Sequence, residues 1–407
     1  MTINKIAGSV TVSKGFKANG IHCGIRKNKT KKDLAVIISD VQANVAAVYT
    51  QNLIKGAPIT ITKKNIVNGV ARAIICNSGN ANTCNADGIE IAEKMCELVA
   101  DATNIAKTDV VIASTGVIGQ ALDISVIEKG IPSLISGLNN TNGGTNAAEA
   151  IMTTDTVPKE CAVSFELDGK LCHLGGIAKG VGMINPNMAT LLVFLTTDVA
   201  ISSSLLQNAI SDDVKGTFNM VSVDGDTSTN DMLVILANGL AENNLITTTD
   251  SNYAIFCKAL NIVTEDLCRK IAFDGEGATK LIQCDVINAK DLVSARKAAK
   301  SVISSALLKS ALNASDANWG RVLCALGYSG ATLNPEKIDV SFESQNGTIL
   351  VCKNGYGVDF DENIATKILS ATTVIVNINL NDGDFKASAW GCDLTEEYVR
   401  INGGYRT

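Results

Sequence analysis

The sequence predicts a layered α+β fold. Apolar runs of strand length are mixed with segments of helical periodicity, and the mixture lacks the regular strand–helix–strand rhythm of a doubly wound sheet. With 407 residues the chain is too long for one compact core, so we expect two domains or one large layered domain. Hydrophobic residues make up 46% of the chain and charged residues 19%, as in ordinary globular proteins.

The first half of the chain is expected to consist of short strands and one well-marked helix. Residues 89–100 carry apolar side chains at helical spacing, and Asp87-Gly88 supplies the start of that helix. Asp168-Gly169 separates two strand-like runs and is typical of a hairpin turn. The expected strands are residues 34–38, 46–49, 73–76, 110–113, 162–167 and 171–174.

The second half has the same mixed character. Residues 289–305 are expected to form a long amphipathic helix, and further helices are expected at 203–214 and 318–326. The expected strands are residues 191–195, 232–237, 338–342, 349–352 and 374–379.

Composition excludes several classes of function. A formal net charge of −6 argues against nucleic acid or an anionic membrane as the main partner. The chain shows neither a secretion signal nor an apolar segment long enough to span a bilayer, so we expect a cytoplasmic protein. The twelve cysteines form no Cys-x-x-Cys pair and mostly lie in apolar runs, which predicts reduced core residues and no metal site.

Histidine is scarce, and this limits the bases available to an enzyme. His22 and His173 are the two histidines of the chain, and neither has a plausible nucleophile as a neighbour in sequence. A terminal amine has an ordinary pKa of about 7.7–8.0, so a useful fraction of it is neutral near physiological pH. Such an amine is the more plausible base.

The most informative segment is residues 179–198. A loop loosened by Gly180 and Gly182 passes a turn at residues 185–187 and then presents Ala189 and Thr190 at the start of an apolar strand. This placement suits attack of the Thr190 hydroxyl on its own preceding carbonyl, and cleavage there would leave Thr190 with both a hydroxyl and a free amine. The same pattern also fits a threonine that only caps or packs.

Three other segments carry candidate functional groups. The polar turn around Thr115 and Gly116 follows a strand and could form an oxyanion hole, although an ordinary strand-to-helix turn has the same pattern. Lys179 could bind a carboxylate, and Glu276, which lies between two glycines, could hold a substrate ammonium group. The chain ends on a structured-looking segment at Asn402 to Thr407, which suggests a positioned C-terminus.

Three segments imitate ligand-binding motifs without completing them. Residues 175–180 lack the register of a phosphate loop, and Gly180-Val-Gly182 lacks the third glycine of a dinucleotide fingerprint. Residues 224–230 look like a calcium loop, but Thr229 stands where the sharp turn requires glycine.

Together these segments resemble the ornithine acetyltransferase (glutamate N-acetyltransferase) family of arginine biosynthesis. The matching pieces occur in one order from end to end: Lys14-Gly-Phe16, residues 77–82, Ser114-Thr-Gly116, residues 152–155, 179–198, 222–231 and 274–280, Asn318-Trp-Gly-Arg321, residues 389–395 and Tyr405-Arg-Thr407.

The resemblance implies a self-cleaving precursor. It implies a cut between Ala189 and Thr190, giving an α chain (1–189) and a β chain (190–407) with a C-terminal α/β portion from about residue 285. It also implies an αββα-type sandwich similar to N-terminal-nucleophile enzymes, assembled as an (αβ)₂ heterotetramer. The implied site residues are Thr190 as nucleophile, Thr115 and Gly116 as oxyanion hole, and Thr153, Lys179, Thr190, Glu276, Asn402 and Thr407 as substrate contacts.

The implied reaction moves an acetyl group from N2-acetylornithine to glutamate. Transfer would follow a ping-pong cycle through an acetyl ester on Thr190, without a cofactor. Two alternatives remain open: acetyl-CoA could serve as a further donor, or the same threonine could belong to a related aminopeptidase or other hydrolase.

Overall fold

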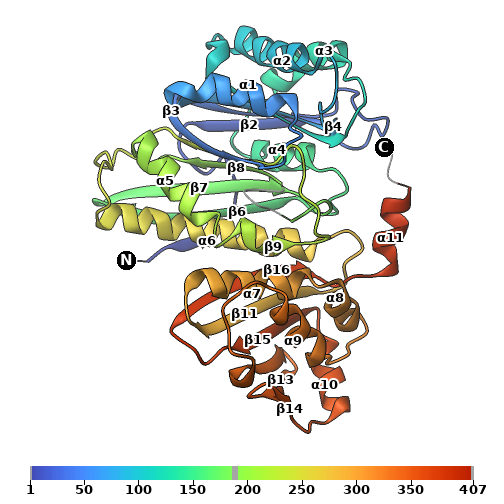
Figure 1. The fold of residues 1–407 in the computed structure, drawn as a ribbon. Helices are drawn as coiled ribbons and strands as arrows, with labels where there is room; N and C mark the ends of the chain where they lie inside the picture. The colour runs from blue at the N-terminus through green and yellow to red at the C-terminus, as the bar shows by residue number, and fades with distance from the viewer. Residues whose placement is uncertain (1, 186–190, 405–407) are drawn as a thin grey trace.

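The computed structural model describes residues 2–185 and 191–404 and has two sheets with helices packed around them (Figure 1). The first sheet has nine strands among the described residues, in the order β1-β6-β7-β8-β10-β3-β4-β5, with β2 also paired to β3. Its strands are β1 (Asn4–Ile6), β2 (Phe16–Ile21), β3 (Leu34–Tyr49), β4 (Val70–Asn80), β5 (Val110–Val117), β6 (Lys159–Leu167), β7 (Lys170–Lys179), β8 (Leu192–Thr197) and β10 (Met232–Ala237).

The first sheet folds over on itself at β3, the strand of 16 residues in its middle. The first part of β3 pairs with β2, and the last part pairs with β10. Between these parts the pairing with β4 shifts register between Ile38 and Ala43, where a bulge bends the strand. The two halves of the sheet therefore face each other, and both halves contribute to one buried apolar cluster that includes Ile37, Ile74, Phe194 and Val234.

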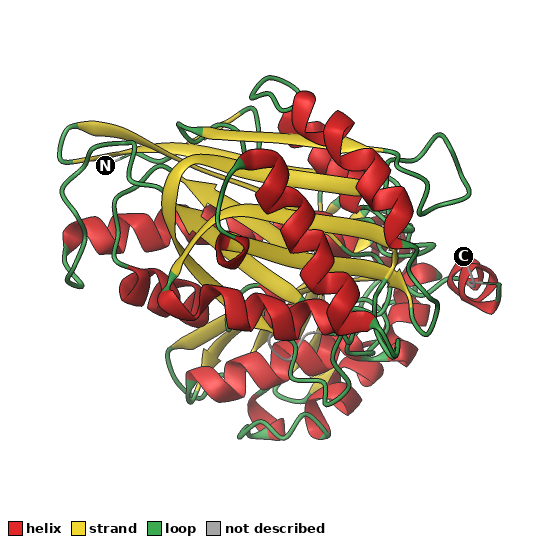
Figure 2. Ribbon diagram, turned by 90° about the horizontal axis from the view of Figure 1, so that it is seen from above, coloured by secondary structure: helices red, strands yellow, loops and turns green. Residues whose placement is uncertain are grey.

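Helices cover the two outer faces of the folded sheet (Figures 1 and 2). Alternate residues of β3 point to opposite sides, so Val36 packs in the cluster under the upper helices while Ile37 packs between the layers. The upper helices are α1 (Ala57–Asn65), α2 (Gly88–Thr103) and α3 (Ile124–Ser136), the lower ones are α5 (Ser203–Asp213) and α6 (Ser251–Phe273), and α4 (Gly143–Ile151) packs against β2 and β3. The expected αββα order is confirmed, with both β layers belonging to one hydrogen-bonded sheet.

The second sheet lies below α6 and has the order β14-β13-β12-β15-β11-β16-β9 (Figure 1). Helix α7 packs on β11 and β16, and α10 packs on β12 and β13. The strands are β9 (Val221–Ser222), β11 (Leu281–Ala289), β12 (Asp339–Ser344), β13 (Gly347–Lys353), β14 (Tyr356–Gly357), β15 (Thr373–Asn379) and β16 (Phe385–Cys392). The helices are α7 (Leu292–Ser304), α8 (Ala306–Asn313), α9 (Trp319–Gly327), α10 (Glu362–Leu369) and α11 (Glu396–Gly403).

Several sequence expectations require correction. The helix expected over 289–305 begins at Leu292, because the Asp291 side chain accepts a hydrogen bond from the Ser294 backbone N–H and caps it, while Ala289 ends β11. The strands expected at 34–38 and 46–49 are parts of the single bent strand β3. The central strands β11 and β16 and the long helix α6 were not expected.

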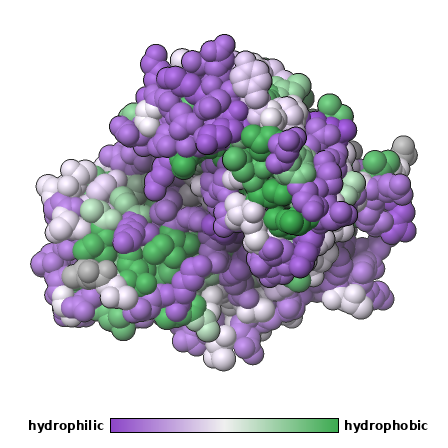
Figure 3. Space-filling model, turned by 90° about the horizontal axis from the view of Figure 1, so that it is seen from below, coloured by the Kyte–Doolittle hydropathy of each residue, from purple (hydrophilic) through white to green (hydrophobic). Residues whose placement is uncertain are grey.

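None of the described helices is both long enough and apolar enough to cross a bilayer. The lower face of the molecule is largely hydrophilic but carries two apolar areas (Figure 3).

Candidate active site

A small cavity lies where the ends of several strands meet the C-terminal helix. Its volume is about 120 Å³. Strands β5 and β7 end at it, the residues that lead into β8 and β10 form one wall, and the loop after α6 and helix α11 close another side. Its lining residues are Thr115, Gly116, Thr153, Thr154, Lys179, Gly182, Met183, Ile184, Leu191, Leu192, Ser228, Asn230, Asp231, Glu276 and Asn402.

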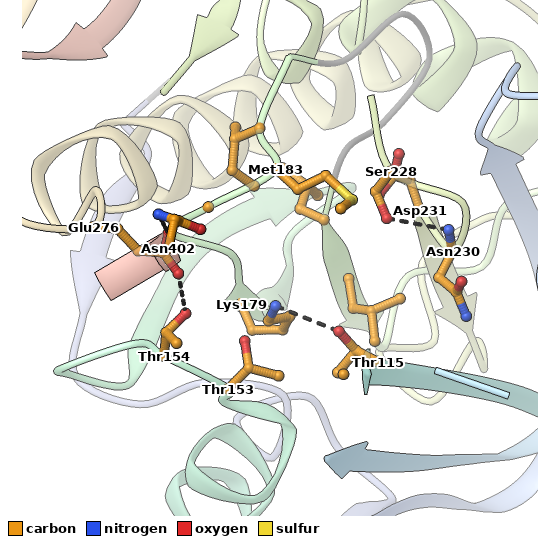
Figure 4. Close-up of a pocket in the computed structure, with 15 residues that line it drawn as sticks. Thr115, Thr153, Thr154, Lys179, Met183, Ser228, Asn230, Asp231, Glu276 and Asn402 are labelled. Atoms are coloured by element: carbon orange, nitrogen blue, oxygen red, sulfur yellow. Dashed lines mark hydrogen bonds between the residues drawn. The ribbon is translucent and has the colours of Figure 1, made fainter. Parts of the chain in front are cut away.

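The cavity brings together all of the candidate site residues that the structure describes. Thr115, Gly116, Thr153, Lys179, Glu276 and Asn402 are separated by up to 287 positions in the sequence but line one space. Figure 4 shows Glu276 and Asn402 at one end, Thr115, Asn230 and Asp231 at the other, and Lys179 between them. Ala189, Thr190 and Thr407 lie outside the described residues, but Leu191, the chain neighbour of Thr190, lines the cavity.

Thr115 and Gly116 sit at the end of β5, beside the end of β4. The Lys179 ammonium group donates to the Thr115 hydroxyl over 3.4 Å, which leaves the hydroxyl proton of Thr115 for another acceptor. Gly116 has a φ of 132°, and a Cβ built on it would lie 2.3 Å from the backbone carbonyl carbon of Gly79. Because β4 and β5 approach this closely, residue 116 must be glycine.

Lys179 is the last residue of β7 and is 7% exposed. Burial lowers the pKa of its ammonium group, and the carboxyl groups of Asp155, Asp231 and Glu276 oppose that effect. Lys179 is therefore a cation held in a cavity largely removed from water, where its attraction for an anion is stronger than at the surface.

A buried ion cluster supports the cavity from behind. Lys159, which is 0% exposed, donates to Asp155 over 2.7 Å and to Asp274 over 2.6 Å. Asp155 also accepts from the backbone N–H groups of Thr153 and Gly180, each over 2.9 Å. Burial alone would raise the pKa of Asp155, but Lys179, Lys159 and these hydrogen bonds hold it below its ordinary value. This carboxylate fixes the loop of Thr153 and the end of β7 in one position.

Glu276 is held by two side chains from distant parts of the chain. Thr154 donates to Oε1 over 2.6 Å, and Asn402 donates to Oε2 over 2.8 Å. The Glu276 backbone N–H donates to the carbonyl of Val181, and a Cβ on Gly182 would come within 2.3 Å of Oε2. Gly182 thus leaves the space that the carboxylate occupies.

Residues 224–232, which lead into β10, hold the chain on both sides of the undescribed residues 186–190. Asp224 accepts from the backbone N–H groups of Met183 and Ile184, and Thr227 donates to the carbonyl of Asn185. Beyond the gap, the Met232 backbone N–H donates to the carbonyl of Leu191 over 2.9 Å. Residues 224–230 resemble a calcium loop, but here the Asp224 carboxylate binds backbone amides.

Sequence reasoning assigned no role to four polar residues of the cavity wall: Thr154, Ser228, Asn230 and Asp231. The last three lie in a segment that looks like a calcium loop and also belongs to the family motif at residues 222–231, so a signal was present although no role was assigned to these side chains. Neither histidine lines the cavity; the side chain of His173 is 2.8 Å from Asp198, and that of His22 is 3.0 Å from Asp33.

The chain thus combines a layered α+β fold with one cavity whose hydroxyl, ammonium and carboxylate groups can bind and polarise a small polar substrate. Over residues 17–407 the chain matches the ArgJ family, and it belongs to that family.

Two relatives are similar to the chain over almost its whole length. The arginine biosynthesis bifunctional protein ArgJ of Caldanaerobacter subterraneus subsp. tengcongensis is 46% identical over 98% of this chain and 99% of its own. ArgJ 1 of Clostridium acetobutylicum is 48% identical over 96% of each chain. A crystal structure of the arginine biosynthesis bifunctional protein from Bacillus halodurans is 47% identical, with a TM-score of 0.50, and covers 52% of this chain and 98% of the solved one.

Proposed function

We propose that this chain is a self-cleaving acetyltransferase of arginine biosynthesis that moves the acetyl group of N2-acetylornithine to glutamate. The observation that carries the proposal is the cavity, which gathers Thr115, Gly116, Lys179 and Glu276 beside Leu191, the residue that follows the candidate nucleophile Thr190. The names of the full-length relatives support arginine biosynthesis as the pathway.

Self-cleavage between Ala189 and Thr190 would divide the chain near its middle. The solved relative from Bacillus halodurans supports this proposal, since a solved chain that matches over 98% of its length covers only 52% of this one. A polypeptide cut at this bond would give pieces of about that size. The hydrogen bonds of Asp224 and Thr227 on one side, and of Met232 on the other, would hold the strands in place while the bond between them breaks.

In the first half-reaction, Thr190 Oγ attacks the acetyl carbonyl and the free amine of Thr190 takes its proton. The oxyanion is stabilised by the Thr115 hydroxyl and the Gly116 backbone N–H, and donors of this kind contribute about 2.7–4 kcal/mol each. The bond from the acetyl carbon to the substrate nitrogen then breaks, and the proton passes to that nitrogen. Ornithine leaves, and the acetyl group remains as an ester on Thr190.

In the second half-reaction, the neutral amine of glutamate attacks the ester carbonyl, the bond from the acetyl carbon to Thr190 Oγ breaks, and a proton from the attacking amine passes by way of the Thr190 amine to Oγ. Both amino acids carry an α-carboxylate, which suits Lys179, and Glu276 suits the side-chain ammonium group of N2-acetylornithine. Thr153, Asn402 and Thr407 would complete the substrate contacts. One cavity could thus serve both half-reactions.

The word bifunctional in the relatives' names favours one extension of this function, which is acetyl-CoA as a further donor. The competing function is hydrolysis, in which water rather than glutamate removes the acyl group. We also propose that the two chains remain together as an (αβ)₂ heterotetramer in the cytoplasm. The apolar areas of the lower face are candidate contact surfaces for this assembly (Figure 3).

Intact-mass measurement and a transfer assay test the proposal together. The purified wild type should give two pieces in place of a single 42.6 kDa chain, and it should move labelled acetyl from N2-acetylornithine to glutamate. Thr190→Ala should abolish both cleavage and transfer, whereas the exposed Thr249→Ala should change neither. Acetate released at the same rate without glutamate would favour the hydrolase, and transfer retained by Thr190→Ala would overturn the mechanism.

A further inference from the structure

Asn230 stands in the wall of the cavity, but its side-chain amide makes all of its hydrogen bonds inside the protein. The residue is 6% exposed. Its Nδ2 donates to the carbonyl of Ala81 over 2.6 Å and to the carbonyl of Ser114 over 3.0 Å. Its Oδ1 accepts from the hydroxyls of Thr83 and Thr229, each over 2.6 Å. An asparagine amide offers two hydrogens and two lone pairs, so this amide has no capacity left for a substrate.

These bonds join the ends of two strands to the segment that leads into β10. Ala81 and Thr83 follow β4, Ser114 belongs to β5, and Asn230 comes two residues before β10 begins. The amide fits between them because Gly56 has no side chain, since a Cβ built there would lie 2.5 Å from Nδ2. Asn230 is therefore a fixed bridge between parts of the chain that are more than 100 positions apart.

The bridge ends directly beside the proposed oxyanion donors. The Ser114 carbonyl belongs to the peptide group that joins Ser114 to Thr115, and a peptide group is planar. Holding its oxygen therefore fixes the direction in which the chain enters Thr115 and then Gly116. Ser114 is also held through its hydroxyl, which donates to Asn77 Oδ1 over 2.6 Å. The Thr115 hydroxyl and the Gly116 N–H thus take their positions from a peptide that Asn230 holds.

We propose that Asn230 is a positioning residue for the oxyanion site. It holds Thr115 and Gly116 in the geometry that their two donors require, and it does not bind the substrate itself. The inference rests on the proposed function, because these donors act in acetyl transfer. Such donors stabilise a developing charge only if they are already in place, and a misplacement of about 1 Å can lower a rate by about 10².

Asn230→Ala removes the whole bridge and leaves Thr115 and Gly116 unchanged. In the cleaved protein we expect kcat for acetyl transfer to fall by about 10- to 100-fold, with KM for N2-acetylornithine within about threefold of wild type. Asn65→Ala is the matched control. Asn65 is 5% exposed, and its Nδ2 donates over 2.8 Å to the carbonyl of Val110, at the other end of β5. This control should lose stability but keep the wild-type kcat, and equal losses of kcat in the two variants would overturn the proposal.

A double-mutant cycle with Thr115→Val shows whether Asn230 acts through the oxyanion donors. In the Thr115→Val background only the Gly116 N–H remains to be misplaced. Asn230→Ala should then lower the logarithm of kcat by less than half as much as it does in the wild-type background. A general loss of stability would give the same decrease in both backgrounds, and that result would contradict a positioning role.

Thr83→Val gives a milder test in case Asn230→Ala does not fold or cleave. It removes one of the two hydroxyls that hold Asn230 Oδ1 and keeps a branched side chain in this buried position. The loss of one hydrogen bond predicts a decrease in kcat of about threefold to tenfold with KM unchanged. A wild-type kcat would count against the proposal. So would failure of this variant to cleave while the wild type cleaves, because Asn230 would then act on the precursor.

Amide hydrogen exchange separates this inference from the proposed function, because it requires no turnover. Exchange at residues 114–117 should be at least about tenfold faster in Asn230→Ala than in wild type, and faster to a smaller degree in Thr83→Val, whereas Asn65→Ala should change only the start of β5. If the wild type transfers no acetyl group but exchange changes in this way, the proposed function fails while Asn230 still holds the strand ends. If the wild type is active and exchange at 114–117 stays the same, the positioning role is wrong.

Discussion

Gly182→Ala offers a test of Glu276 that leaves the Glu276 side chain itself unchanged. The added Cβ would lie 2.3 Å from Oε2 and 2.5 Å from Cδ, so the carboxylate would have to move by about 1 Å to reach ordinary contact. That shift would break its hydrogen bonds with Thr154 and Asn402 and misplace its charge. A hydrogen bond to a charged group is worth about 1.5–3 kcal/mol, which corresponds to a loss of roughly tenfold to hundredfold in kcat/KM.

The assay is acetyl transfer to glutamate, measured on protein that mass spectrometry shows to be cleaved. Gly327→Ala is the control, because a Cβ at that helical position meets nothing within 4 Å and should leave kcat/KM unchanged. A double-mutant cycle with Glu276→Gln shows whether the effect acts through the carboxylate. A large loss from Gly182→Ala in the Glu276→Gln background, or none in the wild-type background, would refute the reasoning.

Three further predictions concern the oxyanion site and the buried ions. Thr115→Val should keep the fold and lower kcat by about 10²–10³, as measured in steady-state transfer. Lys159→Met should lower the free energy of unfolding by about 3–5 kcal/mol, because it removes the ammonium group that pairs with two buried carboxylates. The exposed pair of Lys5 and Asp266 should contribute only about 0–1 kcal/mol in the matched Lys5→Met variant. The pKa of Asp155 is lowered in the folded protein, so the ionised carboxyl stabilises the fold above its ordinary pKa of about 3.9. This stabilisation disappears as the pH falls through the folded pKa, so acid unfolding of Asp155→Asn should depend less on pH below about 4.

The sequence was most informative where the relevant interactions are local. The apolar spacing of residues 89–100 predicted α2, and Asp168-Gly169 predicted the β6–β7 hairpin, because helix and turn formation depend on neighbouring residues. The strand after Thr190 was also found in this way, whereas Thr115 and Gly116, which were expected in a turn after the strand 110–113, belong to β5 itself. The central strands β11 and β16 were missed. Their pairing joins residues about 100 positions apart, and no local sequence pattern indicates which segments pair.

Segments of the chain thus determined the mixed α+β class, the loop into Thr190 and the individual candidates Thr115, Lys179 and Glu276. Tertiary structure decided that the sheet folds over at β3 and that these candidates line one cavity. It also decided the role of residues 224–231. In the sequence their acidic side chains look like metal ligands, but in the fold Asp224 accepts a backbone hydrogen bond and Asp231 is buried. The physical reason is that the pKa of a side chain, and its need for a hydrogen-bond partner, depend on its burial and on nearby charges. Burial and nearby charges are both set by contacts between distant parts of the chain.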